Sequence, residues 1–188
     1  YCLIGATAMS VWGYARFTAD IDLLTMDDRV LERSFWEPSG LVSTIGAIRR
    51  GDISDPLGGL VRFKPAPAVD VIVGRGAVMR EAVQTAIVHP ALGPIATPLM
   101  VALMKIEAGG IKDRWDVAQL LQARSRIEPG VDLAGLIELR VKTMSDWAQR
   151  AWARVKEVLA ELESESSAAH WAAPSDTSDG ADIDEPEV

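Results

Sequence analysis

The sequence is poor in three features that would narrow its class at once: cysteine, histidine and long apolar runs. Among 188 residues there are one cysteine, Cys2, and two histidines. A single cysteine excludes an internal disulfide framework and is typical of a reducing compartment. His89 has no second His or Cys near it in the sequence, so it is a poor candidate for zinc binding. No apolar run reaches the ~18 residues of a transmembrane helix and no signal-peptide pattern is present, so we expect a cytoplasmic protein outside the membrane.

Negative charge is in excess, but much of the excess lies at one end of the chain. The formal net charge is −8, from 27 acidic and 19 basic residues. Residues 165–188 contain seven of the acids and no Lys or Arg, which leaves 20 acids against 19 bases in the remainder. An acidic segment rich in Ser, Ala, Pro and Asp buries too little apolar surface to fold, so we expect a disordered tail over 165–188. The remainder is neutral enough to approach a nucleic acid through a local patch.

Short apolar strands alternate with helical patterns along the rest of the chain. The patterning predicts strands over 1–4, 41–48, 60–64 and 69–73, and helices over 6–14, 29–35, 77–86, 96–107, 131–140 and 142–162. We therefore expect an α/β (α+β) fold, with a small mixed sheet and a helical C-terminal half. The predicted divisions are a core over 1–125, C-terminal helices over 126–164 and the tail.

Two carboxylates stand two residues apart within a predicted buried strand. Asp20 and Asp22 lie in the stretch ARFTADIDLL, residues 15–24. Residues i and i+2 of a strand project from the same face, and paired ionised carboxylates are costly to bury unless a cation neutralises them. Asp70, in the later strand AVDVIVG, would add the third carboxylate of a two-metal phosphoryl-transfer site. The alternative is a pair of strand-end aspartates bonded to loop amides.

Several further residues have both a functional and a structural interpretation. The strand–glycine–helix junction at Gly5-Ala6-Thr7 can bind an anion through free N–H groups, or it can be a plain tight turn. Arg16 can pair with a phosphate or with Asp20, or lie exposed at the rim. Arginine and lysine on the predicted strands can line a nucleotide or RNA groove, or be solvated strand ends; these residues are Arg49, Arg50, Arg62 and Lys64.

Lys105 lies inside an apolar helical run, so its ammonium must reach solvent or find a negative partner. Asp113 and Asp116 share the inward face of the next predicted helix. They either cap that helix or pair with Lys105 or Arg16.

Taken together, these residues resemble the polymerase-beta-type nucleotidyltransferase superfamily. The resemblance rests on Gly5 with the helix after it, Arg16, Thr18, Asp20-Ile21-Asp22 and Asp70. The later stretch KIEAGGIKDRWDVAQLL, residues 105–121, is similar to the branch that contains AbiEii-type abortive-infection toxins and minimal nucleotidyltransferases. The similarity spans roughly residues 1–121. Ala6 departs from the Gly-Gly or Gly-Ser pair that is usual in that superfamily, and a helix that usually precedes the first strand is expected to be missing.

The resemblance implies transfer of a nucleoside monophosphate from an NTP to an acceptor hydroxyl, with release of pyrophosphate. It implies two Mg²⁺ ions held by Asp20, Asp22 and Asp70, a triphosphate held at Gly5, Ala6, Thr7 and Arg16, and active-site roles for Lys105 and Asp113. The implied acceptor is RNA or tRNA in a toxin–antitoxin setting, with a cognate antitoxin as protein partner. The alternatives are a small-molecule acceptor and a catalytically decayed binding module, which the Ala6 departure raises.

Overall fold

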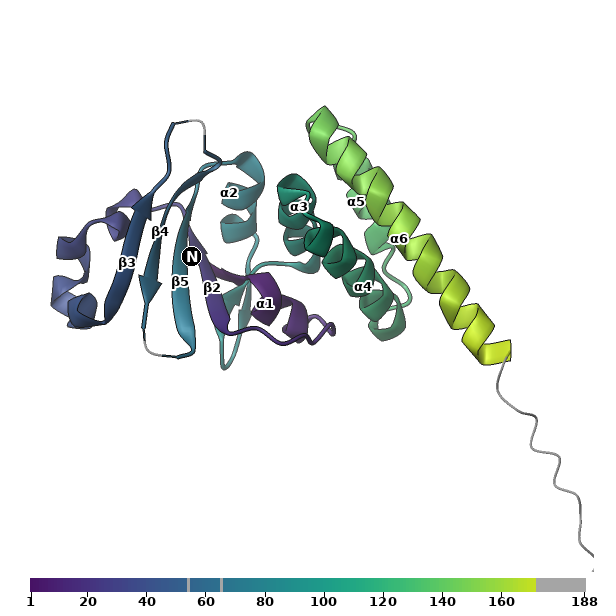
Figure 1. The fold of residues 1–188 in the computed structure, drawn as a ribbon, viewed down its shortest axis with the longest axis horizontal. Coiled ribbons are helices and arrows are strands. Elements are labelled where there is room, and N and C mark those ends of the chain that lie inside the picture. The colour runs from purple at the N-terminus through teal and green to yellow at the C-terminus, as the bar shows by residue number, and fades with distance from the viewer. Residues whose placement is uncertain (54, 65, 172–188) are drawn as a thin grey trace, which may run out of the picture.

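The computed structural model describes residues 1–53, 55–64 and 66–171 (Figure 1). The strands are β1 Cys2–Ile4, β2 Asp20–Thr25, β3 Ile45–Arg50, β4 Leu57–Phe63, β5 Ala68–Gly74, β6 Ile87–His89 and β7 Gly93–Ile95. The α-helices are α1 Gly5–Val11, α2 Ala77–Gln84, α3 Pro98–Ala108, α4 Ile111–Ile127, α5 Leu133–Val141 and α6 Asp146–Trp171. Three 3₁₀ helices, η1 Asp28–Leu31, η2 Arg33–Ser39 and η3 Leu41–Thr44, lie between β2 and β3.

One mixed sheet organises the N-terminal half. Its seven strands run in the order β3-β4-β5-β2-β1-β7-β6. The pairs β2–β5 and β1–β7 are parallel, and the other neighbouring strands are antiparallel. The α/β prediction with a mixed sheet and a helical C-terminal half is thus confirmed.

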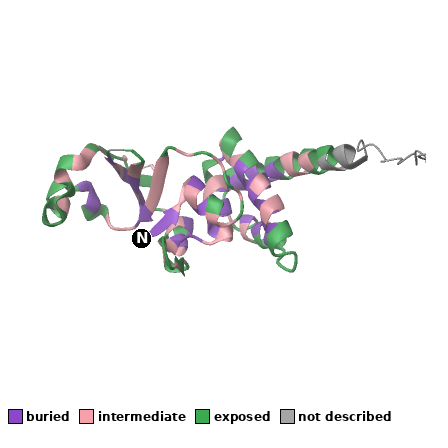
Figure 2. Cartoon of the chain, turned by 90° about the horizontal axis from the view of Figure 1, so that it is seen from below, coloured by how far each residue is buried: buried purple, intermediate pink, exposed green. Residues whose placement is uncertain are grey.

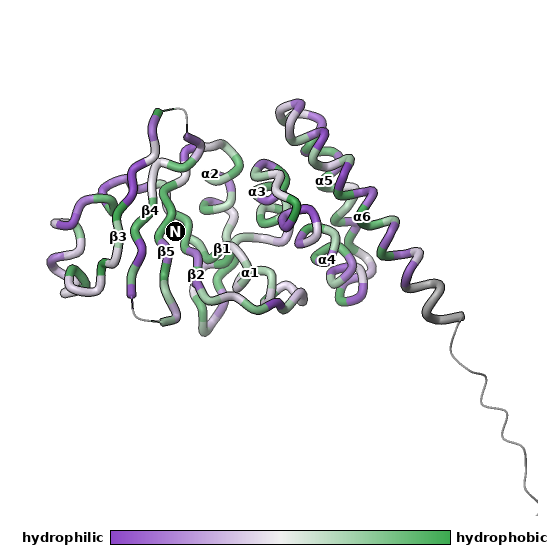
Figure 3. The backbone as a smooth tube through the Cα atoms, viewed as in Figure 1, coloured by the Kyte–Doolittle hydropathy of each residue, from purple (hydrophilic) through white to green (hydrophobic). Residues whose placement is uncertain are grey.

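Each face of the sheet is covered by a separate apolar cluster. On one face, Leu24 of β2 belongs to a core that also contains residues of α1, α2 and α3. On the opposite face, Val71 and Phe63 pack with Val30 and Leu31 of η1. Because side chains alternate along a strand, β5 contributes to both clusters and is hydrophobic along most of its length (Figure 3).

The helices α3 to α6 form the second half of the molecule, beside the sheet (Figure 1). Helix α3 begins at Pro98, with the Thr97 hydroxyl accepting a hydrogen bond from Met100 N, and ends at Gly109 in the left-handed conformation. Hydrophobic and hydrophilic residues alternate along helix α6 (Figure 3), and exposed residues predominate where it leaves the other helices (Figure 2). Its C-terminal part projects beyond those helices (Figure 1). No helix in the described part of the chain has the length and apolar character that crossing a membrane requires.

The structure corrects several predicted boundaries. The stretch 15–19 is not part of the sheet, because β2 begins only at Asp20. The helix expected over 29–35 is two 3₁₀ helices, since Glu32 between them has extended backbone angles. Residues 41–44 form η3, and the strand begins at Ile45. The predicted tail over 165–188 is helical up to Trp171, and the rest of that tail lies outside the described residues.

Candidate active site

The three aspartates of the predicted metal site lie on one face of two adjacent strands. Strand β2 pairs with β5 in parallel, and Asp22 is in register with Asp70. Asp20 lies two residues before Asp22, so all three side chains project from the same face of the sheet. The Asp70 side chain is 8% exposed and the Asp20 side chain 37%, so the cluster runs from the protein interior to solvent.

Arg62 of β4 lies between two of these carboxylates. It is in register with Asp70 across the antiparallel β4–β5 pair. Its Nε donates to Asp70 Oδ1 at 2.7 Å, and its Nη2 donates to Asp70 Oδ2 at 2.5 Å and to Asp20 Oδ2 at 3.0 Å. The hydrogen bonds to Asp70 and the nearby negative charge raise the pKa of Arg62 above its ordinary value. Arg62 therefore belongs to the acidic cluster and is not a solvated strand end.

Asp22 lies against the start of helix α1. A Cβ on Gly5 would be 2.1 Å from Asp22 Oδ2 and 3.0 Å from Asp22 Cγ, and Gly5 has a φ of +65°. Only glycine fits both this backbone angle and this close approach. The Gly5 backbone thus fixes one side of the Asp22 carboxylate, and the N-terminal turn of α1 adjoins the acidic cluster.

Burial raises the pKa of Asp22 above its ordinary value, and the charges of Asp70 and then Asp20 raise it further. The positive charges of Lys105 and Arg16 act in the opposite direction. An additional cation at this face would therefore favour the ionised form of Asp22.

Lys105 and Arg16 are held near Asp22 by acids of helix α4. Lys105 Nζ donates to Asp113 Oδ1 at 2.9 Å and to Asp116 Oδ2 at 2.6 Å. Arg16 Nε lies 3.1 Å from Asp116 Oδ1, although within the described residues that Nε–H has no acceptor in hydrogen-bond geometry. The cap position of α4 is Gly110, so Asp113 and Asp116 are ion-pair partners and do not cap the helix.

Of the residues in the predicted triphosphate-binding turn, only some lie at the acidic cluster. Gly5 is the first residue of α1, and Ala6 directs its side chain into the core with 1% exposure. Thr7 is half-buried on the next position of the helix. Ser10, one turn later, donates its hydroxyl proton to Ala6 O at 3.0 Å and so bonds within its own helix. The structure brings Gly5 to Asp22, whereas binding of a triphosphate at Ala6 and Thr7 stays a prediction.

The charges of this site do not cancel. Lys105 and Arg16 are balanced by Asp113 and Asp116. Arg62 balances one of the three carboxylates Asp20, Asp22 and Asp70, so the cluster has a formal surplus of two negative charges. As arranged here, however, no group of three His, Cys, Asp or Glu within residues 1–53, 55–64 and 66–171 has the geometry to hold a metal ion.

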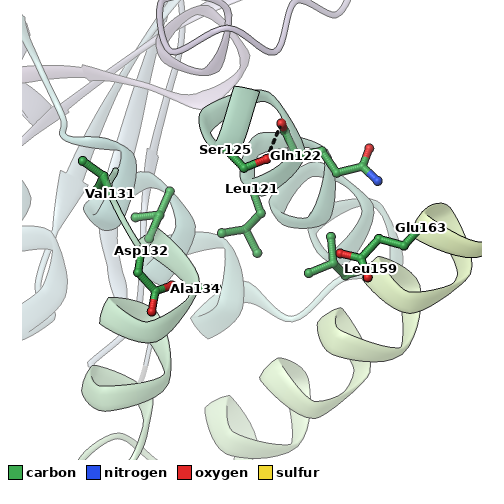
Figure 4. Close-up of a pocket in the computed structure, with 9 residues that line it drawn as sticks. Leu121, Gln122, Ser125, Val131, Asp132, Ala134, Leu159 and Glu163 are labelled. Carbon is green, nitrogen blue, oxygen red and sulfur yellow. Dashed lines mark hydrogen bonds between the residues drawn. The ribbon is translucent and has the colours of Figure 1, made fainter. Parts of the chain in front are cut away.

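A separate pocket lies between α4, α5 and α6 (Figure 4). It is poorly suited to binding a nucleotide phosphate. It measures about 180 Å³, and its charged lining residues are the acids Asp132 and Glu163. The other lining residues include Leu121, Val131 and Leu159. The residues that line this pocket include no Lys or Arg that could bind a phosphate group. We therefore place the candidate site at the sheet, where Arg16, Arg62 and Lys105 lie among the acids.

Comparison with known proteins adds no assignment. No protein-family model matches the chain, and no curated protein matches it in sequence. The functional argument therefore depends on the residues and geometry described above.

The sequence allows two interpretations of Arg62, but it also contains a signal for the position of this residue. The run LVRF, residues 60–63, is joined to AVDVIV by a short proline-containing link, which is typical of a hairpin. In a hairpin, an arginine and an aspartate eight residues apart can face each other across the pair.

Proposed function

We propose that this protein is a Mg²⁺-dependent nucleotidyltransferase that moves a nucleoside monophosphate from an NTP to an acceptor hydroxyl and releases pyrophosphate. One observation carries the proposal above the others: three carboxylates on adjacent, in-register strands share a face and keep a surplus of two negative charges. A divalent cation would neutralise that surplus.

The residues present fit such an ion in their chemistry. Mg²⁺ takes oxygen ligands and is commonly held by one or two protein carboxylates together with substrate phosphates. Asp20, Asp22 and Asp70 would hold it, and the ion would supply charge neutralisation at the phosphates. The raised pKa of Asp22 supports the same assignment, because excess negative charge around that carboxyl group is one of its causes.

The other residues of the site would position and neutralise the nucleotide. The Lys105 ammonium is held by Asp113 and Asp116 at the buried side of the cluster, where it would oppose phosphate charge without moving. Arg16 would act beside it, from the segment before β2. Asp70 is linked through Arg62 to Asp20 at the exposed end of the cluster. It would be a metal ligand beside the attacking hydroxyl and would accept the proton of that hydroxyl.

RNA is the acceptor class that we propose, as the resemblance suggests, within a toxin–antitoxin pair. The openness of the site supports a large acceptor: the side chains of Arg62 and Asp20 at its outer end are 39% and 37% exposed. A polymer can present a hydroxyl group at such an open face without entering an enclosed pocket.

The proposal is tested by following pyrophosphate release and label transfer from each of the four NTPs into total RNA. We expect transfer with Mg²⁺, none with EDTA, and a loss of at least about 100-fold for Asp70→Asn, because positioning and charge stabilisation provide most of the rate in phosphoryl transfer. Asp28→Asn makes the same chemical change at an exposed residue of η1 and should leave the rate unchanged. Transfer at the wild-type rate by Asp70→Asn would contradict the assignment.

A further inference from the structure

Arg62 holds the acidic cluster together by occupying the position that a cation would take. Its planar guanidinium forms bidentate hydrogen bonds with both carboxylate oxygens of Asp70 and a third hydrogen bond with Asp20. Guanidinium is a monovalent cation that matches carboxylates in this planar geometry. In the arrangement described here, Arg62 performs for Asp20 and Asp70 the neutralisation that a shared metal ion would perform.

Binding of Arg62 and binding of a metal ion at the same two carboxylates exclude each other. An ion between Asp20 and Asp70 would need oxygens that now accept hydrogen bonds from Arg62, and its charge would repel the guanidinium at contact distance.

The Arg62 side chain can also move away from Asp20 and Asp70 toward solvent. Its side chain is 39% exposed, whereas the Lys105 side chain is 13% exposed and is held by two aspartates. Of the two cations, Arg62 is the one whose side chain already lies partly in solvent. Its release would break the ion pair with the buried Asp70 carboxylate, and the bound metal ion would replace that pair. Once released, its guanidinium would still be tethered to β4 at the open end of the cluster, where the anionic nucleotide is proposed to bind.

We propose that Arg62 is a resident counter-cation that competes with the divalent cation for Asp20 and Asp70, and that it is displaced from them when the metal ion binds. This inference rests on the proposed function, because it assumes the metal site. It makes Arg62 a positioning residue: Arg62 keeps Asp20 and Asp70 adjacent in the metal-free protein and lowers the affinity of the site for metal.

The experiment is a Mn²⁺ titration of the full chain without nucleotide, with free Mn²⁺ measured by electron paramagnetic resonance. Arg62→Gln should bind Mn²⁺ about tenfold more tightly than the wild type, which is within the usual range of coupling between two linked binding events. Asp70→Asn should remove the binding and so assign the ion to the cluster. Arg80→Gln removes a positive charge from an exposed position of α2 and should leave the affinity unchanged.

Equal or weaker Mn²⁺ binding by Arg62→Gln would overturn the inference. Absence of binding in both the wild type and Arg62→Gln would also overturn it, together with the metal site. Because the titration uses metal alone, a failure of nucleotide transfer in the separate turnover assay would leave a positive result for Arg62 intact, so the two failures are distinguishable.

A measurement on the wild-type protein covers the case in which Arg62→Gln does not fold. The Arg62 Nε–H resonance, assigned by its loss in Arg62→Lys or by backbone-linked assignment, should be protected from solvent exchange in EDTA. Addition of Mg²⁺ should shift it and remove the protection, since the hydrogen bond to Asp70 Oδ1 breaks. A resonance that keeps its position and protection at saturating Mg²⁺ would contradict displacement.

Discussion

Asp22 is the residue at which the demands of stability and of the proposed chemistry oppose each other most directly. Its carboxylate is partly buried beside Asp20 and Asp70 and against the backbone of Gly5. A group held in this way disfavours the folded state whenever it is ionised. The proposed cation at this face would remove that cost.

We predict that Asp22→Asn stabilises the metal-free protein at neutral pH by about 0.5–2 kcal/mol, the usual scale for removal of an unfavourable feature. The folded pKa of Asp22 is raised, so the wild type loses stability as pH rises from the unfolded pKa through the folded one. The difference should therefore be present at pH 7.5 and shrink toward pH 4.

Urea unfolding in EDTA at both pH values measures this difference, with Asp28→Asn as the exposed control. An Asp22→Asn protein that is no more stable than the wild type at pH 7.5 would show that the carboxylate is not under electrostatic stress.

A second prediction concerns Gly5, for which Gly40 offers a matched control. Both residues have positive φ, +65° and +72°, but a Cβ at Gly40 would meet nothing within 4 Å. Gly5→Ala should therefore cost about 1–3 kcal/mol more than Gly40→Ala, the usual cost of overpacking. It should also displace the Asp22 carboxylate and weaken Mn²⁺ binding. Urea unfolding of the two variants gives the comparison, and equal losses would show that Asp22 does not contact Gly5.

Among single residues, the positions of the three acids could be predicted from the sequence, whereas the contact that Arg62 makes with them could not. The spacing of Asp20 and Asp22 fixes their common face in any strand, and Asp70 stands in an equally clear strand pattern. The contact of Arg62 with Asp70 depends on the register between β4 and β5, which strand composition alone does not determine.

Helices α3 and α4 meet through an ion-pair network with buried and partly exposed members. The Asp116 side chain is 3% exposed and contacts both Lys105 and Arg16, while the Asp113 side chain is 27% exposed and contacts Lys105 alone. Breaking a buried pair leaves charge without compensation, whereas an exposed pair is replaced by water.

Asp116→Asn should accordingly lower the free energy of unfolding by about 3 kcal/mol, and Asp113→Asn by less than about 1 kcal/mol. The two substitutions are chemically identical and lie one helical turn apart, so their difference reports burial and the contact with Arg16. Urea unfolding at pH 7.5 measures both, and a larger loss for Asp113→Asn would reverse the proposed arrangement of the network.

For the elements, apolar patterning predicted most strands and helices to within a few residues. It was wrong over the segment between β2 and β3. Three 3₁₀ helices lie there, in place of a predicted helix and half of a predicted strand. Of these, η1 and η2 pack on the sheet face of Val61, Val71 and Phe63. Short elements of this kind are shaped by the sheet face beneath them more than by their own periodicity.

The two halves of the molecule are joined by an ion pair between α2 and α5. Arg140 Nη1 donates to Glu81 Oε1 at 2.7 Å and Arg140 Nη2 to Glu81 Oε2 at 2.5 Å. The hydrogen bonds from Arg140 lower the pKa of Glu81 below its ordinary value of 4.5. An acid with a lowered folded pKa contributes stability above its unfolded pKa, and that contribution is lost as pH falls through the folded value.

Glu81→Gln should therefore destabilise the protein at pH 7 by up to about 1 kcal/mol, since both side chains are about one-third exposed and solvent screens the pair. The difference from the wild type should disappear below the pH at which Glu81 becomes protonated. Thermal unfolding from pH 7 to pH 3 follows it, with Glu157→Gln on the exposed face of α6 as control. A difference that is constant with pH would mean that the pair contributes through shape alone.

At the scale of the whole molecule, the alternation of strand and helix patterns along the chain was enough to predict an α/β fold with a helical C-terminal half. They were not enough to predict the strand order, in which β1 lies between β2 and β7. That order brings the start of α1 beside β2, and it is what places Gly5 against Asp22.

The central claim is that the acidic cluster binds a metal–triphosphate, and calorimetric titration of each NTP tests it most directly. The titrations use the wild type and Asp20→Asn/Asp22→Asn, each with Mg²⁺ and with EDTA. The account predicts binding of at least one NTP by the wild type that requires Mg²⁺ and is absent from the double variant. Binding of equal strength in EDTA or in the double variant, or no binding of any NTP by the wild type, would contradict it.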